Sequence, residues 1–285
     1  MIKKRRGGLL LLLGFFLILL LSLPIIGFTA PVGNPATTDV PKGPGVFSMK
    51  QDKNLSIKTA VDFDFLFDKK IHADAATNTK FTSAQWYMVR LSYGMFNERV
   101  EPYIKLGMAH IKSQWTEGAT DIKLESDNGF AWGLGTKALI YNLEKPKVKF
   151  IGDLFYRMAD LDVEKGYVAG TQVTPTKSKS KFAIREWQFA LLAATEIDVS
   201  GSGRTEALGV SKIVPYAGIK YSDLSGRLRL TQSDATFFNP GKLEAEHNIG
   251  IFAGCDILGT DSVLLNVEGR LIDETALSAG MAVLF

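Results

Sequence analysis

Charged side chains that could form ion pairs recur at alternate positions along the chain. Between Leu55 and Asp68, even-numbered positions hold Lys58, Asp62 and Asp64, whereas nearly all odd-numbered positions are apolar. Similar alternation returns in later segments, where charges of both signs share one phase. We expect one set of residues to line a polar interior: Lys58, Asp62, Asp64, Arg90, Lys105, Lys137, Asp153, Arg157, Glu186, Lys220, Asp256, Glu268 and Arg270.

The three histidines are the other candidates for acid–base chemistry. His72 has Asp74 nearby, His247 follows Glu246, and His110 lies in an alternating segment. A carboxylate near a histidine is common on any polar surface, so this spacing does not indicate a catalytic site. We therefore expect no catalytic residues and no enzymatic activity.

Metal and cofactor chemistry finds little support in the sequence. Cys255 is the single cysteine, which excludes an intramolecular disulfide and a paired-cysteine metal site. No glycine-rich phosphate loop or nucleic-acid motif is present. We expect no metal, no cofactor and no nucleic-acid partner.

The alternation itself predicts the elements that position these residues. A β-strand sends successive side chains to opposite faces, so each segment has one apolar and one polar face. We expect an all-β fold, a transmembrane antiparallel up-and-down β-barrel of about ten strands, with eight or twelve as alternatives, each about 10–15 residues long. The predicted strands are 55–68, 86–95, 102–114, 129–141, 148–159, 183–197, a segment from 214, 248–256, 262–272 and 277–285.

The connections between the predicted strands are long and short in turn. This asymmetry is typical of barrels with short periplasmic turns and long outer loops. Segment 198–211 is too long for such a turn, the hairpin at Asp273 and Glu274 is too short for such a loop, and 226–232 either extends a strand or belongs to a further hairpin. Aromatic residues gather near strand ends, as at the two faces of a bilayer. A soluble β-sandwich with ordinary core aromatics is the alternative.

The N-terminus predicts export. The four basic residues Lys3 to Arg6 precede an apolar run from Leu9 to Phe28, the order found in secretory signals. We expect a signal peptide at 1–30, a flexible periplasmic leader at 31–53 and a barrel at 54–285; a retained helical anchor is the alternative. Because four of the 33 basic residues lie in the signal, the formal charge of +3 says nothing about nucleic acid.

The C-terminus resembles the last strand of bacterial outer-membrane β-barrel proteins. Leu277, Ala279, Met281 and Val283 are apolar at every second position, and the chain stops at Phe285. The rest of the barrel is similar to small porin-like barrels in general fold only. The resemblance implies a location in the cell outer membrane, and Phe285 as the assembly signal that the barrel assembly machinery reads. It also implies contact with outer-membrane lipid and lipopolysaccharide. The oligomeric state is left open.

Some barrels of this class are enzymes, such as the omptin proteases. Those enzymes place acidic pairs and an Asp/His pair at the outer rim, and the spacing around His72 and His247 does not reproduce that arrangement. The cationic stretch from Lys177 to Lys181 could meet lipopolysaccharide phosphates or form a solvated loop.

The expected interior favours a closed tube. A barrel of eight to ten strands is filled by its own side chains, and opposite charges in so narrow a space should pair. We expect Arg270 to pair with Asp62 or Asp64. The sequence thus favours a charged, plugged lumen and a structural, adhesive or envelope-stabilising role; a narrow porin-like channel for small hydrophilic solutes is the alternative.

Overall fold

A computed structural model describes residues 56–96, 99–145, 147–173, 180–199, 209–229, 240–259 and 263–284. The expected signal peptide, the leader, Lys177 to Lys179 of the cationic stretch and Phe285 lie outside these residues, and the expectations for them stay predictions. Within the described residues, no helix is long and apolar enough to cross a membrane.

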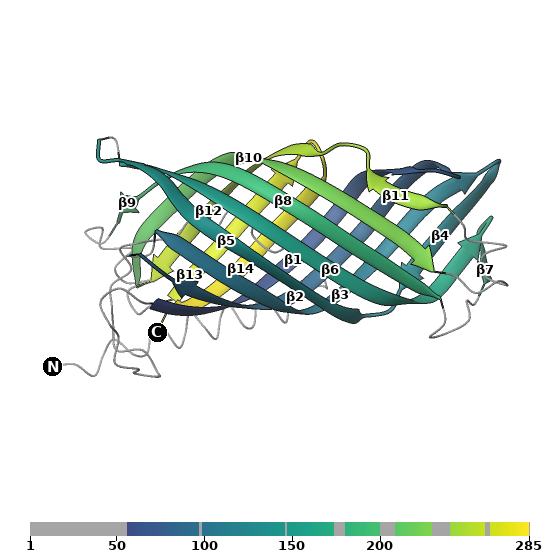
Figure 1. The fold of residues 1–285 in the computed structure, drawn as a ribbon, viewed down its shortest axis with the longest axis horizontal. Coiled ribbons are helices and arrows are strands. Elements are labelled where there is room, and N and C mark those ends of the chain that lie inside the picture. The colour runs from purple at the N-terminus through teal and green to yellow at the C-terminus, as the bar shows by residue number, and fades with distance from the viewer. Residues whose placement is uncertain are drawn as a thin grey trace.

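The described chain consists almost entirely of antiparallel strands (Figure 1). Their bounds are β1 Ser56–Ala73, β2 Thr77–Gly94, β3 Val100–Glu117, β4 Thr120–Ser126, β5 Gly129–Leu143, β6 Val148–Val168, β7 Thr171–Val173, β8 Lys181–Thr195, β9 Ile197–Asp198, β10 Val210–Arg229, β11 Lys242–Ala245, β12 Ile249–Gly259, β13 Val263–Leu271 and β14 Thr275–Leu284.

Ten of these strands close into a barrel, which confirms the predicted fold and strand number. The ring runs β1, β2, β3, β5, β6, β8, β10, β12, β13 and β14, and β14 pairs with β1. Because β14 lies between β13 and β1, Ser278 faces Glu268 on one side and Asp64 on the other. No bulky side chain therefore stands between these two charged residues.

The expected long outer loops are largely strands, which corrects the prediction. Strands β1 and β2 run on until only residues 74–76 separate them, β6 reaches Val168, and β10 continues to Arg229. Segment 226–232 therefore begins as a strand extension. Figure 1 shows that β4, β7 and β11 lie at the end of the barrel far from the start of β1 and the end of β14. We use the term outer extension for the part of the wall at this end, which consists of β4, β7, β11 and the ends of the longer strands that pair with them and with each other there.

The ring loses two strands in the outer extension. Strand β4 takes the place of β5 between β3 and β6, and β11 joins β10 directly to β1. The ring there consists of β1, β2, β3, β4, β6, β8, β10 and β11, whereas hairpin β13–β14 is confined to the ten-stranded part. An eight-stranded ring is just wide enough for side chains to fill.

The exterior of the ten-stranded part is an apolar band. Large side chains there are strongly exposed, among them Ile219 at 55% and Leu134 at 49%. Trp187 and Tyr221, at 51% and 49%, lie towards the outer edge of this band, and the Trp187 ring packs 4.6 Å from that of Tyr156. The predicted apolar faces thus lie on the outside of the barrel, and the predicted charged faces lie on the inside.

The polarity of the wall inverts in the outer extension. On β3, the inward Lys105 is followed by the buried Ala109, Ile111 and Trp115, while the alternate positions such as Lys112 are polar and partly exposed. This is the arrangement of a soluble protein. It explains why sequence alternation alone mistook these strands for loops, since an apolar phase was expected to face outward everywhere.

Two similar Pro-Tyr pairs in the sequence share a packing role. Tyr103 faces Gly135 on β5, and Tyr216 faces Gly254 on β12. A Cβ at either glycine would lie within 2.4–2.5 Å of the tyrosine ring. Glycine is therefore required at both positions so that the tyrosine ring can lie against the neighbouring strand.

Candidate functional site

All thirteen residues expected to line the lumen are buried within the barrel. The most exposed, Lys58, is 8% exposed, and Asp62, Glu186, Asp256 and Glu268 are at 0%. They come from nine of the ten strands of the ring.

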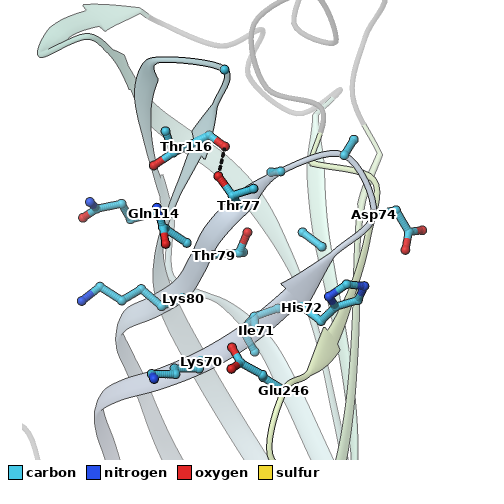
Figure 2. Close-up of a pocket in the computed structure, with 15 residues that line it drawn as sticks. Lys70, Ile71, His72, Asp74, Thr77, Thr79, Lys80, Gln114, Thr116 and Glu246 are labelled. Carbon is cyan, nitrogen blue, oxygen red and sulfur yellow. Dashed lines mark hydrogen bonds between the residues drawn. The ribbon is translucent and has the colours of Figure 1, made fainter.

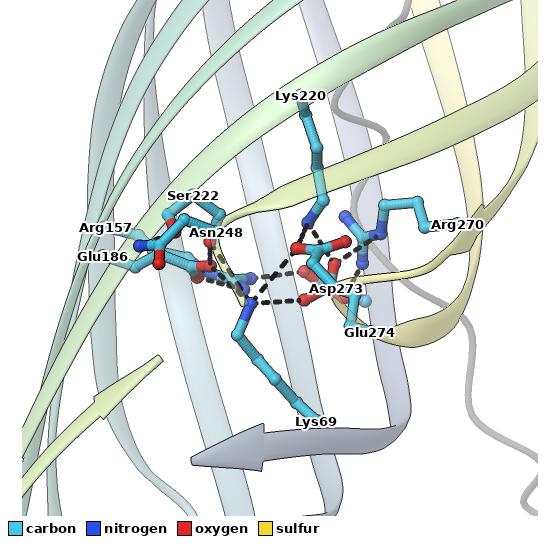
Figure 3. Close-up of polar contacts among 10 residues, drawn as sticks. Lys69, Arg157, Glu186, Lys220, Ser222, Asn248, Arg270, Asp273 and Glu274 are labelled. Atoms are coloured by element: carbon cyan, nitrogen blue, oxygen red, sulfur yellow. Dashed lines mark hydrogen bonds and ion pairs between the residues drawn. The ribbon is translucent and has the colours of Figure 1, made fainter. Parts of the chain in front are cut away.

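Eight of the buried charges form what we call the outer charge cluster (Figure 3). Its four carboxylates and four cations are Asp64, Glu186, Asp273, Glu274, Lys69, Arg157, Lys220 and Arg270. A buried charge is costly unless it is paired and hydrogen-bonded. The equal numbers of both signs allow each member to be compensated within the cluster.

Glu274 is central to this cluster. Its Oε1 lies 2.5 Å from Lys220 Nζ and 3.0 Å from Arg270 Nε, and its Oε2 lies 3.1 Å from Lys69 Nζ. Asp273 contacts the same two lysines through Oδ2, at 3.3 Å from Lys69 and 3.0 Å from Lys220. One short turn therefore joins cations from three strands.

Two arginines complete the outer charge cluster. Arg270 Nη2 donates to Asp64 Oδ1 at 2.7 Å, which confirms the expected pairing of Arg270 with a carboxylate of the first strand. Arg157 bridges Asp64 and Glu186, with its Nε 2.6 Å from Glu186 Oε2. The Arg157 guanidinium also lies 4.2 Å from the centre of the Trp86 ring, a cation–π contact that is strengthened by exclusion of water.

Sequence reasoning missed three members of this cluster. Lys69 points inward because the pairing of β1 with β14 shifts between Leu66 and Asp68, and Asp68 is thereby turned to the outside. The run Phe65, Leu66, Phe67 breaks the alternation and was a signal of this change of phase. The sequence places Asp273 and Glu274 in a short outer hairpin, and no spacing indicates that the tip of this hairpin turns inward.

A second group, the inner charge cluster, lies nearer the chain ends. It comprises Lys58, Asp62, Arg90, Glu101, Lys105, Lys137 and Asp153. Lys105 Nζ lies 3.0 Å from Asp62 Oδ2, and Lys58 Nζ lies 2.8 Å from Glu101 Oε2. Glu101 was not predicted, although it has the same phase as Lys105 on its strand.

Aromatic rings support the inner charge cluster. The Tyr103 hydroxyl donates to Asp153 Oδ1 at 2.8 Å, and Lys105 Nζ lies 4.9 Å from the centre of the Phe155 ring. Arg90 Nε is 3.6 Å from Asp62 Oδ2, beyond hydrogen-bond distance. In this contact, charge rather than a hydrogen bond holds Arg90 beside Asp62.

Across the barrel, a third polar group surrounds Tyr216. Its hydroxyl donates to Glu268 Oε2 at 3.0 Å and accepts a hydrogen bond from Asn266 Nδ2 at 2.8 Å. The Asn266 amide also donates to Asp256. Asp256 and Glu268 thus form part of a hydrogen-bonded group around one tyrosine.

An apolar core fills the barrel beyond the outer charge cluster. On β8, Glu186 is followed towards the outer end by Ile184 and Phe182, both at 0% exposure, and on β6 Arg157 is followed by Leu161. The Phe182 and Phe81 rings pack edge to face at 5.8 Å. Side chains from β1, β2, β3, β4, β6, β8, β10 and β11 join this core.

A polar groove of about 840 Å³ lies beside the β1–β2 turn (Figure 2). Lys70 and Lys80 face each other across the two strands and point in the same direction as Gln114. Lys80 Nζ lies 3.3 Å from Asp68 Oδ1, and this ion pair offsets part of the repulsion between Lys70 and Lys80. His72 and Glu246 also line the groove. The groove presents charged groups of both signs, together with neutral hydrogen-bonding groups, to a molecule outside the barrel.

The other two histidines have carboxylate neighbours on the outer extension. His110 Nε2 lies 3.5 Å from Glu125 Oε1, and His247 Nε2 lies 3.7 Å from Glu246 Oε1. Glu125 also contacts Lys112 at 2.9 Å. Neither arrangement brings a nucleophile to the imidazole in these contacts.

At the end of the barrel opposite the outer extension, Glu196 lies between two lysines. Its carboxylate accepts hydrogen bonds from Lys149 and, at 3.3 Å, from Lys212. Burial alone would raise the pKa of Glu196, and the hydrogen bonds and charges of the two lysines lower it below its usual value.

Comparison with known proteins gives one curated relative and several barrel structures. No protein-family model matches the chain. The major outer membrane porin of Chlamydia trachomatis serovar D is 23% identical over 216 residues, covering 54% of this chain and 51% of the relative. The chain therefore spans about half the length of the curated relative that it matches.

Combined with the ten-stranded ring and its apolar exterior, this match decides the class. The chain is an outer-membrane β-barrel protein. The predicted cell location, the outer membrane, is thereby confirmed.

Among solved structures, this outer-membrane barrel is similar to three others. The translocator domain of the autotransporter NalP from Neisseria meningitidis has 11% identity and a TM-score of 0.37, covering 82% of this chain and 89% of that one. An outer membrane channel from Pseudomonas putida F1 has 9% identity and a TM-score of 0.36, covering 85% and 99%. The transport unit of the autotransporter AIDA-I from Escherichia coli has 8% identity and a TM-score of 0.34, covering 84% and 93%. With scores this low, the fold assignment rests on this chain's own strand pairings.

The exposed band predicts which substitutions the bilayer will resist. Ile219→Arg, in the middle of the apolar exterior of β10, is expected to destabilise the outer-membrane barrel by roughly 2–4 kcal/mol, the cost of arginine near the bilayer midplane. Urea unfolding in phospholipid vesicles measures this loss. Ser225→Arg has the same strand and the same outward face but lies in the outer extension, so its unfolding midpoint should stay near that of the parent. Equal losses in both variants would contradict this placement of the membrane.

Proposed function

We propose that this outer-membrane barrel is a non-conducting envelope protein with a structural, adhesive or envelope-stabilising role. The observation that carries the proposal is the apolar core within the eight-stranded outer extension. Water and ions avoid a closely packed apolar interior. A solute entering from the inner end would meet both charge clusters and then this core, so passive diffusion is not favoured.

The outer extension supports the adhesive or stabilising part of the proposal. Its strands extend the wall beyond the apolar band, and its exterior is polar, as a surface in water requires. The groove beside the β1–β2 turn presents Lys70, Lys80 and Gln114 on this exterior. Such a rigid, polar platform is suited to contacts with lipopolysaccharide or another cell-surface molecule.

A narrow channel is the second candidate, since the curated relative is named a porin. Conductance of the purified protein in planar phospholipid bilayers separates the two. We expect no steady ion steps over a range of voltages, with folding verified by heat-modifiable migration of the same preparation. Reproducible steps from folded protein would favour the channel and reject the non-conducting role.

A further inference from the structure

The C-terminal hairpin β13–β14 is inserted as a wedge into an otherwise eight-stranded wall. Strands β11 and β12 follow each other along the same side of β10. In the outer extension β11 also pairs with β1, whereas further in β13 and β14 separate β12 from β1. The hairpin thus widens the ring only within the apolar band.

The two strands of the hairpin differ in their interior side chains: β13 reaches across the lumen through Arg270 to Asp64 and through Glu268 to Tyr216, whereas β14 has no such side chain. The inward positions of β14 are Ala276, Ser278, Gly280 and Ala282, all small. Small side chains bury little area and make few contacts across the lumen. Apart from its backbone pairing with β1 and β13, β14 therefore has little of its own to anchor it in the barrel.

The tip of the hairpin is built differently. Ile272 has a φ of 84° and points outward with 68% exposure, whereas the next two residues, Asp273 and Glu274, are 2% and 3% exposed. A β-branched residue with positive φ is strained. This conformation places an apolar residue outside and two carboxylates inside within three positions.

The two carboxylates reach strands on both sides of the wedge. Lys69 belongs to β1, next to the last pair of β1 with β14, and Lys220 belongs to β10, beyond β12. Gly250 of β12 faces Lys220, and a Cβ there would lie 1.9 Å from Asp273 Oδ1. The absence of a side chain at Gly250 thus leaves room in the wall for the Asp273 carboxylate at the tip of the hairpin.

We propose that Asp273 and Glu274 form a lock that holds hairpin β13–β14 between β12 and β1. The lock joins the hairpin through Lys69 to one side of the gap and through Lys220 to the other. When it is broken, the weakly anchored β14 opens from β1 before the rest of the barrel unfolds.

Hydrogen exchange measured by mass spectrometry on the folded full-length protein in detergent micelles tests the lock. In Glu274→Gln, which keeps the shape but removes the charge, we expect amides of β13 and β14 to exchange at least about tenfold faster, since hydrogen bonds to charged groups are stronger than those to neutral ones and exchange reports local opening. Amides of β3, β5 and β6 should keep their protection. Glu101→Gln is the matched control, because it breaks a buried pair with Lys58 far from the tip.

Three results would overturn the lock. They are unchanged exchange in Glu274→Gln, acceleration spread evenly over all strands, and the same acceleration of β13 and β14 in Glu101→Gln. If Glu274→Gln fails to fold, a disulfide between Phe63→Cys and Ala279→Cys, which face each other on β1 and β14, is added in a Cys255→Ser background. Recovery of the folded form by this tether supports the lock, and failure to recover rejects it.

Discussion

Phe182→Ala is expected to destabilise the barrel by roughly 3–5 kcal/mol, the loss typical of removing a buried phenylalanine from a packed core. Phe182 is at 0% exposure in the outer extension, and its ring packs against Phe81. The substitution leaves a cavity among strands that have backbone pairing on both sides and little freedom to collapse. Equilibrium unfolding by urea, followed by tryptophan fluorescence, measures the loss.

Lys181→Ala is the control for this prediction. Lys181 is the neighbouring residue on β8, its side chain lies on the outside, and its contact with Asp162 is a long, solvent-exposed ion pair of 3.8 Å. Such pairs contribute about 0–1 kcal/mol, so the unfolding midpoint should hardly move. If Phe182→Ala were as stable as Lys181→Ala, the outer extension would not contain a packed apolar core.

The sequence predicted the barrel because alternation reports directly which residues share a face. The face that meets lipid cannot be read from alternation alone. In the membrane band the apolar phase is outside, as at Ile219, whereas in the outer extension it is inside, as at Ile111 and Trp115. The sequence therefore predicts the strands up to the edge of the band and predicts loops where the structure continues them.

Alternation likewise predicts only part of the candidate site. Single residues with a clear phase, such as Arg157 and Glu186, were placed inside correctly by period alone. Lys69 was missed because one bulge reverses the phase, a local event that changes every residue after it. The inward turn of Glu274 depends on cations from β1 and β10, distant in sequence, so only tertiary structure brings them together.

Arg270→Ala is expected to lower the free energy of unfolding by about 3 kcal/mol, the low end of the range for breaking a buried ion pair. Arg270 is 1% exposed and contacts both Asp64 and Glu274. The loss stays at the low end because Asp64 keeps Arg157, and Glu274 keeps its lysines. Arg270→Lys, which retains the charge but loses the two-sided contact, should fall between the parent and Arg270→Ala.

A double-mutant cycle with Asp64→Asn isolates the contact itself. Residues in direct contact show interaction energies of about 0.5–3 kcal/mol, so Arg270→Ala should cost less in the Asp64→Asn background than in the parent. Unfolding in phospholipid vesicles gives the energies, and planar-bilayer conductance of the same variants reports any leak. If Arg270→Ala changed neither the unfolding midpoint nor the conductance, and the cycle showed no coupling, the interior would be wetter and wider than these contacts imply. The channel would then become the better account of this barrel, because exposed, solvated ion pairs contribute little and leave room for solutes.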